Sequence, residues 1–139
     1  VGSAKVSKNG VEGDFNVFRE SRGGDPSRAV CIFSLERIEE LKGEGHPIEV
    51  GSTGENLTLR GIQWSSLEDG MRLEIGDAIL ELSEPCAPCS KIGESFMERR
   101  FGRVDHEQEE GWSRWLARVV QEGLVSIGDS VNIIISPEK

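Results

Sequence analysis

The sequence predicts one mainly β (α+β) domain spanning residues 1–139, with only a few short helices. Three observations predict it. The chain has 139 residues of which 36 % are hydrophobic, its 17 glycines are spread along it as turn signals, and Gly-Asp pairs sit beside short β-prone runs. A chain of this length buries roughly 68 % of its unfolded surface, so it needs no disulfide or metal to hold a core.

The clearest strand signals are a buried strand and a hairpin. Residues 29–33 are short and continuously apolar, which is typical of a buried strand. Residues 71–75 and 78–82 alternate apolar and polar positions around Gly76-Asp77, which predicts a hairpin with a tight turn. Residues 1–7 and 56–62 give weaker strand signals.

The phrase Ile-Gly-Asp at 75–77 recurs at 127–129. The repeated motif predicts a second, similar hairpin in which residues 124–127 pair with residues 130–135. Two copies of a short motif are too few to indicate a repeat architecture.

Three helices are expected. Ser34 is a suitable N-cap for a helix to about Lys42, with Gly43 as its stop. Residues 112–120 carry apolar side chains at i, i+3, i+4, i+7 and i+8, which predicts an amphipathic helix. A third helix is expected from just after Pro88 to about Phe101.

Charge and hydropathy exclude several classes of protein. The formal net charge is −9, an unfavourable field for nucleic acid or an anionic membrane surface. No apolar run approaches the roughly 18 residues of a membrane span. Three cysteines, an odd number, fit a reducing compartment better than a disulfide framework. We therefore expect a cytoplasmic protein without nucleic-acid or membrane partners.

Two cysteines follow the predicted hairpin, where a strand gives way to a helix. Cys86 and Cys89 form a Cys-Ala-Pro-Cys motif. Unpaired amides in a first helical turn stabilise an anion, so we expect a lowered pKa for the Cys89 thiol, helped by Lys91. The thiolate would serve as a nucleophile or as a soft-metal ligand.

Other interpretations of Cys-x-x-Cys compete with this one. A zinc site needs two more ligands, and the remaining Cys31, His46 and His106 have no paired spacing. A thioredoxin-like site would need a surrounding βαβ pattern that the sequence lacks, although a redox dithiol on another fold stays open. Both thiols would also suit a buried, proline-stiffened corner. Cys31, inside an apolar strand, is expected in the core, and no histidine is assigned a catalytic role.

Four motifs, taken in order, resemble one known family. They are Gly23-Gly24-Asp25-x-x-Arg28-Ala29-Val30, Gly51-x-x-Gly54-Glu55-Asn56-Leu57-Thr58, Gly76-Asp77 and Pro85-Cys86-x-Pro88-Cys89. The sequence is thereby identified as resembling the MOSC domain, named from the C-terminal part of molybdenum cofactor sulfurase. The resemblance spans most of the chain, and its tail, from Gly111-Trp112 to Gly128-Asp129, is similar to that of small stand-alone members.

The resemblance implies a strongly curved, β-barrel-like sheet and one cysteine that holds molybdenum or a persulfide sulfur. Cys89 matches that cysteine and would be the metal ligand of a pyranopterin molybdenum cofactor. In sulfurase relatives the domain receives or passes on sulfur. Pyridoxal phosphate would then belong only to a partner protein of the cysteine desulfurase type.

Further site residues follow from the matching motifs. Arg28 would clamp the cofactor's terminal phosphate, or would form an ordinary surface pair with Asp25. Gly54, Glu55 and Asn56 would line the pocket, or Asn56 would merely organise a turn. Lys91, together with the arginines that follow it, would give a local basic zone for a phosphorylated cofactor.

One departure from the family concerns Cys86, where many larger relatives carry arginine. Cys86 would instead resolve a persulfide or sulfenate on Cys89 by forming a disulfide. The function expected from the sequence is molybdenum-cofactor binding, sulfur carriage, or both, through Cys89. A thiol-redox component, a reductase of N-hydroxylated compounds and a non-catalytic cofactor-binding module are the alternatives.

Overall fold

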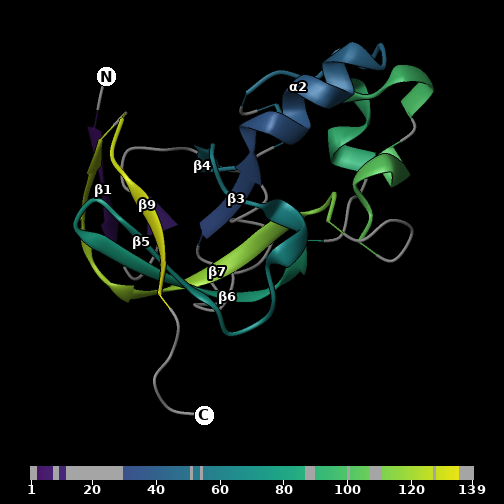
Figure 1. Ribbon diagram of the computed structural model, residues 1–139. Helices are drawn as coiled ribbons and strands as arrows, with labels where there is room; N and C mark the ends of the chain where they lie inside the picture. The colour runs from purple at the N-terminus through teal and green to yellow at the C-terminus, as the bar shows by residue number, and fades with distance from the viewer. Residues whose placement is uncertain are drawn as a thin grey trace. The chain divides into compact units, whose positions relative to one another are not determined.

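A computed structural model describes residues 3–7, 10–11, 30–50, 52–53, 55–86, 90–99, 101–106, 111–126 and 128–134. Most elements are strands, which confirms the mainly β prediction (Figure 1). The strands are β1 (Ser3–Ser7), β2 (Gly10–Val11), β3 (Val30–Ser34), β4 (Leu57–Leu59), β5 (Arg72–Ile75), β6 (Ala78–Cys86), β7 (Arg114–Gln121), β8 (Gly123–Ser126) and β9 (Val131–Ile134). The helical elements are α2 (Leu35–Gly43) and the 3₁₀ turns η2 (Trp64–Ser66), η3 (Ser90–Ser95), η4 (Met97–Arg99) and η5 (Phe101–Val104).

The chain forms two compact units. The first contains residues 1–30, 68–84 and 116–139, and the second contains residues 31–67 and 85–115. The strand order is β2-β1-β8 in the smaller sheet and β4-β3-β7-β6-β5-β9 in the larger one. In the described part of the chain, no helix has the length and apolarity that a membrane crossing requires.

The first unit is built on antiparallel pairs that curl strongly (Figure 1). β1 pairs with β2 on one side and with β8 on the other, so that Val6 lies opposite both Val11 and Gly123. β5 lies between β6 and β9. Its alternation buries Leu73 and Ile75, the apolar positions of the predicted pattern. The curved sheet expected from the family resemblance is present in this unit.

The predicted hairpin around Gly76-Asp77 is confirmed. β5 and β6 pair from Ile75↔Ala78 at the turn to Arg72↔Glu81. Gly76 has φ +55°, a left-handed conformation that a glycine adopts without steric cost. The amide of Asp77 donates to the carbonyl of Leu124 at 3.0 Å, so the turn is attached to β8.

The second predicted hairpin is wrong. β8 and β9 lie where strands were expected, but β8 pairs with β1 and β9 pairs with β5. The Gly128-Asp129 turn does form: the Asp129 amide donates to the Ser126 carbonyl at 3.0 Å, and the Asp129 carboxylate accepts from the Ser126 amide at 2.7 Å. Each strand pairs instead with an edge of another strand, where unpaired N–H and C=O groups accept a new neighbour.

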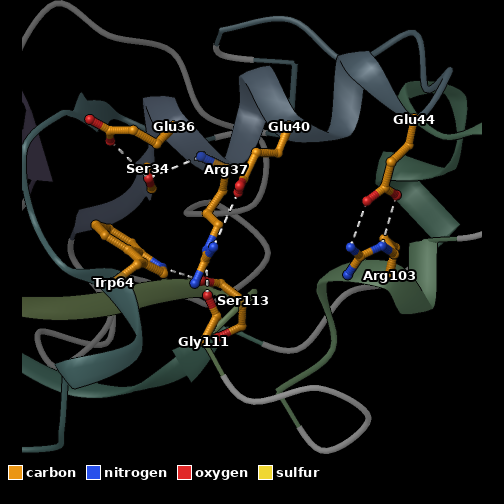
Figure 2. A network of polar contacts seen from close by, with 9 residues as sticks. All are labelled: Ser34, Glu36, Arg37, Glu40, Glu44, Trp64, Arg103, Gly111 and Ser113. Atoms are coloured by element: carbon orange, nitrogen blue, oxygen red, sulfur yellow. Dashed lines mark hydrogen bonds and ion pairs between the residues drawn. The ribbon is translucent and has the colours of Figure 1, made fainter.

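The second unit contains β3 from Cys31 onward, and all five residues of this strand are buried. β4 runs parallel to it, with Ile32 opposite Leu57. Ser34 ends the strand and caps α2, since its hydroxyl accepts from the Arg37 amide at 3.1 Å (Figure 2). The helix buries Ile38 and Leu41 and ends at Gly43, as the sequence predicts.

The helix predicted over residues 112–120 is wrong, because Arg114–Gln121 is strand β7. Its residues 114–117 are buried without interruption, although a one-sided helix would expose part of such a run. β7 lies between β3 and β6 in the strand order, and an inner strand covered on both faces reads as a continuous apolar run. The helical periodicity of its apolar residues was therefore misleading.

The helix predicted from Pro88 to Phe101 is also incorrect. The described residues of this stretch form the short turns η3, η4 and η5. Glu98 has φ +55°, which no regular right-handed helix accommodates. The chain therefore turns repeatedly after the cysteine motif.

Aromatic and ionic contacts hold these turns to α2. The guanidinium of Arg37 lies 4.3 Å and that of Arg103 lies 3.9 Å from the ring centroid of Trp112. Arg37 also donates to the Gly111 carbonyl at 2.8 Å, and Arg103 pairs with Glu44 through two nitrogens at 3.0 and 2.7 Å (Figure 2). Each arginine is fixed by a carbonyl or carboxylate as well as by the ring.

The two Gly-Asp turns give a matched pair of substitutions. Gly128→Ala adds only the strain of a left-handed alanine, about 1–2 kcal/mol, because a methyl group there meets open space. In Gly76→Ala the methyl group would lie 2.7 Å from the Leu124 carbonyl, which adds a clash of about 1–3 kcal/mol. Urea denaturation checks the order, and equal losses in the two variants would contradict the described packing.

Candidate functional site

The described part of the site lies in the second unit and does not include every predicted residue. Cys89, Arg28 and Gly54 lie outside the described residues. Lys91 belongs to η3, but its side chain is not among those described. Cys86, Glu55 and Asn56 are described, and their surroundings define the candidate site.

Asn56 is attached to Cys31 by two hydrogen bonds. Its side-chain Oδ1 accepts from the Cys31 amide at 2.8 Å, and its own amide donates to the Cys31 carbonyl at 2.7 Å. Asn56 thus continues the β3–β4 pairing by one residue beyond the strand end. This geometry gives Asn56 the role of organising the loop, and its contact with a cofactor stays a prediction.

Glu55 is buried and is held by hydroxyl groups. Thr53 donates to its Oε1 at 2.5 Å, and Thr58 donates to its Oε2 at 3.1 Å. Arg114, which is also buried, donates to the Thr53 carbonyl at 2.7 Å. The Gly-Glu-Asn-Leu-Thr segment is therefore held by its own Thr58, by Thr53 just before it, and from β7 by the buried cation of Arg114.

The thiols of Cys31 and Cys86 meet in this cluster. Both cysteines are buried, and both are reduced. The pKa of Cys31 is raised well above its ordinary value, first by its hydrogen bond to Cys86 and then by burial; Arg114 opposes the shift and Glu55 adds to it. Cys31 therefore stays a protonated thiol beside the Cys86 sulfur.

The burial predicted for Cys31 is confirmed, but its contact with Cys86 had no signal in the sequence. The two cysteines lie on different strands and far apart in the chain. Arg114 was also missed, because the incorrect helix over residues 112–120 gave no reason to place it in a core. A charged residue inside an apolar run is the one signal that would have drawn attention to it.

His46 secures the chain that follows the cysteine motif. Its Nδ1 accepts from the Met97 amide at 3.0 Å, and its ring meets Phe96 edge-on at a centroid distance of 5.4 Å. Ser95 donates to the Ser52 hydroxyl at 2.8 Å. The turns after the cysteine motif are thereby tied to the loop that leads into the Gly-Glu-Asn-Leu-Thr segment.

Part of the predicted basic zone is already paired. Arg103 binds Glu44, whose pKa is lowered first by this hydrogen-bonded pair and also by nearby His46. Among the described residues, no three acidic, histidine or cysteine side chains gather as a metal-binding group. The Cys86 thiol, the Glu55 carboxylate and the Arg114 guanidinium influence the pKa of Cys31, but they do not form such a group.

Comparison with known proteins decides the family. The model of the MOSC domain matches residues 19–132. The chain belongs to the MOSC domain family. The described part of the candidate site is thus assembled from two of the motifs that carry the resemblance, because Glu55 and Asn56 come from one and Cys86 from the other.

Relatives of this MOSC chain include bacterial and fungal proteins. It is 29 % identical over 135 residues to the uncharacterized protein YflK of Bacillus subtilis, covering 95 % of the chain and 59 % of YflK. It is 26 % identical over 137 residues to protein YiiM of Escherichia coli, covering 96 % of the chain and 60 % of YiiM. A protein named Reductase from Gibberella moniliformis is 29 % identical over 142 residues, 98 % of the chain and 24 % of that protein.

Solved structures share the fold. The crystal structure of YiiM from Geobacillus stearothermophilus superposes with a TM-score of 0.71 at 24 % identity, over 96 % of the chain and 60 % of that structure. The YUAD protein of Bacillus subtilis gives a TM-score of 0.70 at 19 % identity, over 96 % of the chain and 85 % of that protein. The MOSC chain spans about 60 % of the length of YflK and YiiM.

Thr53 and Thr58 each donate a hydrogen bond to Glu55, so substituting them one at a time shows how much each bond stabilises the protein. Thr53→Val keeps the shape of a fully buried side chain but leaves Glu55 without its shorter hydrogen bond, so we expect a loss of about 1–3 kcal/mol. Thr58→Val removes the longer bond at a half-buried position and should cost less. Chemical denaturation measures both, and a larger loss in Thr58→Val would contradict the network.

The Glu44–Arg103 pair predicts a pH-dependent difference in stability. A lowered pKa in the folded state contributes stability above the ordinary value of 4.5, and that stability is lost as the pH falls through the folded value. Arg103→Gln should therefore be less stable than the parent at pH 7, with the difference shrinking below about pH 4.5.

The control for this pair is the same substitution in a Glu44→Gln background. There the effect of Arg103→Gln should lose the part that depends on the Glu44 carboxylate, while the loss of the contact with Trp112 remains. The measurement is the free energy of unfolding from urea titrations between pH 3 and pH 7. A difference that grows on acidification would refute the assignment.

Proposed function

We propose that this MOSC chain binds a molybdenum cofactor, or carries sulfur, through the thiolate of Cys89. The observation that supports it is the meeting of two family motifs at Cys31. Asn56 binds the Cys31 backbone, and Cys86 contacts the Cys31 thiol. This meeting brings the segment before Cys89 to the Gly-Glu-Asn-Leu-Thr segment.

A thiolate at Cys89 would suit a soft metal or a sulfur species. Thiolate sulfur is the protein ligand that soft centres prefer, whereas a cage for a hard cation would need several oxygen ligands. In this proposal Cys89 would be the ligand, Arg28 and Lys91 would bind the phosphate of the cofactor, and Gly54 would help to line the pocket. When bound, the cofactor would supply reduction or sulfur-transfer chemistry.

If the chain carries sulfur, it needs a partner protein that donates the sulfur and a second thiol that removes it from Cys89. The sulfur would arrive from a pyridoxal-phosphate protein of the cysteine desulfurase type, in the cytoplasm. A thiol is a good acceptor for it because thiolates attack sulfane sulfur through the same exchange chemistry that forms disulfides. Cys86 would resolve a persulfide on Cys89: its thiolate would attack the Cys89 sulfur, break the bond to the outer sulfur, form the Cys86–Cys89 disulfide and release hydrosulfide.

A second candidate function is reduction of N-hydroxylated compounds as one component of a larger system. The relative from Gibberella moniliformis that carries the name Reductase supports it, since the match covers 98 % of this chain but only 24 % of that protein. The remaining parts of such a system, including an electron donor, would lie outside the matched region.

Metal and sulfur analysis of the purified protein tests the proposal. Protein made in a host that produces the cofactor should contain near-stoichiometric molybdenum, or should carry one extra sulfur atom on the peptide with Cys89, removable by a reducing agent. Cys89→Ala should lose both signals. Benzamidoxime reduction with an artificial electron donor tests the second candidate.

Cys86→Ala is the matched control, three residues away in the same motif. It should keep molybdenum or accept the sulfur atom, while releasing that sulfur more slowly. Absence of molybdenum and of extra sulfur in the parent protein would overturn the proposal. Identical behaviour of the two variants would overturn the division of roles between the cysteines.

A further inference from the structure

The imidazole of His46 joins two parts of the second unit through its two nitrogens. Nδ1 accepts from the Met97 amide at 3.0 Å, and Nε2 lies 3.5 Å from a carboxylate oxygen of Glu44. A backbone N–H donates only to a nitrogen with a free lone pair, so the bond to Met97 places the ring proton on Nε2, where it faces Glu44. The side chain of His46 is only 5 % exposed, so water competes little for either nitrogen.

The surroundings of the imidazole hold it in this orientation. Glu44 is the C-cap of α2, and its carboxylate binds Arg103 at 3.0 and 2.7 Å (Figure 2). The ring of Phe96 meets the imidazole edge-on at a centroid distance of 5.4 Å. His46 is therefore an acceptor of fixed position, and the Met97 amide is the group that it places.

The bond to Met97 acts on the chain that follows the cysteine motif. η3 begins at Ser90, directly after Cys89 in the sequence, and ends at Ser95, two residues before Met97. Ser95 donates to the Ser52 hydroxyl at 2.8 Å. The same loop, residues 44–53, thus supplies a second bond to this stretch of the chain.

Side-chain burial does not account for the position of the chain at Met97. Met97 is 39 % exposed, and the next residue, Glu98, is exposed and has φ +55°. A backbone that leaves the helical region beside exposed side chains needs a polar contact to fix its path. The bond from the Met97 amide to His46 provides that contact.

We propose that His46, with its ring proton on Nε2, is a positioning residue that holds the turns after Cys89 against the loop leading into the Gly-Glu-Asn-Leu-Thr segment. His46 lies on the loop that continues through Thr53 to Glu55. One imidazole therefore ties the chain that follows one family motif to the chain that precedes another. Its effect on the loading of Cys89 rests on the proposed function, whereas its effect on Met97 does not.

The competing explanation is that His46 only fills space in the core. Two substitutions separate the explanations, because each keeps one half of the imidazole. His46→Asn places an amide oxygen where Nδ1 lies and keeps an acceptor for Met97, whereas His46→Gln reaches the place of Nε2 and keeps a donor for Glu44. If His46 served packing alone, the shorter asparagine would leave the larger cavity and would be the more disruptive of the two.

Amide hydrogen exchange, followed by NMR on protein without cofactor, tests the proposal. We expect the Met97 amide to exchange about tenfold faster in His46→Gln than in the parent, and within about threefold of the parent in His46→Asn. Amides of the buried strand β3 report global unfolding and should keep their relative rates in both variants. Equal rates at Met97 in the two variants, the reverse order, or a matching acceleration in β3 would overturn the proposal.

Nitrogen-15 NMR of the histidine rings provides a second measurement that needs no variant to fold. At about pH 8, the parent protein should show His46 with its proton on Nε2 and with an unprotonated Nδ1. A proton on Nδ1 would overturn the proposal, because that nitrogen could not accept from Met97.

The link to Cys89 is tested by the molybdenum and sulfur content of the same two variants. His46→Asn should retain more of the parent's content than His46→Gln, and equal contents would overturn the link. A parent with neither molybdenum nor extra sulfur would overturn the proposed function, while the exchange of the Met97 amide would still decide the role of His46.

Discussion

The two hydrogen bonds between Asn56 and Cys31 are the constraint on which the described site depends. They join the Gly-Glu-Asn-Leu-Thr segment to the buried strand β3 at one fixed register. Because an amide side chain replaces a backbone acceptor, the chain can leave the strand pairing there and still satisfy the Cys31 amide. The loop before Asn56 is thus free to carry other side chains into the cluster.

The cluster that results is polar and buried, and its described hydrogen bonds come from several directions. Glu55 takes hydroxyl donors from both sides along its own segment, and Arg114 binds the Thr53 carbonyl from β7. Buried charges of this kind are costly unless they are bonded, so their presence at a thiol pair points to a task beyond packing. One effect of the cluster is to keep the Cys31 thiol protonated, because its pKa is raised by Cys86 and by burial.

The sequence predicted those elements whose signals are local. Ser34 and Gly43 mark the ends of α2, and Gly76-Asp77 marks the hairpin, because capping and turn chemistry act within a few residues. β7 was mistaken for a helix because apolar residues on both faces of an inner strand can fall by chance at helical spacing. β8 and β9 were predicted as strands, but their partners are β1 and β5 rather than each other. The local sequence of a strand does not specify which distant strand it pairs with.

The candidate site was predicted in its parts but not in its contacts. The motifs identified Cys86, Glu55 and Asn56, whereas the contact of Cys86 with Cys31 and the bond from Arg114 to Thr53 arise only when distant strands pack together. Cys89, Arg28 and Gly54 lie outside the described residues, so their assignments stay predictions.

A double-mutant cycle of Asn56→Ala and Cys86→Ala, measured by urea denaturation, tests directly whether Cys31 links the two motifs. Neither residue needs to touch the other for the cycle to report their link through Cys31. We predict a coupling free energy of about 0.5 kcal/mol or more, because each substitution loosens the residue that the other one holds. Strictly additive losses would show that the two motifs are independent and would contradict the account.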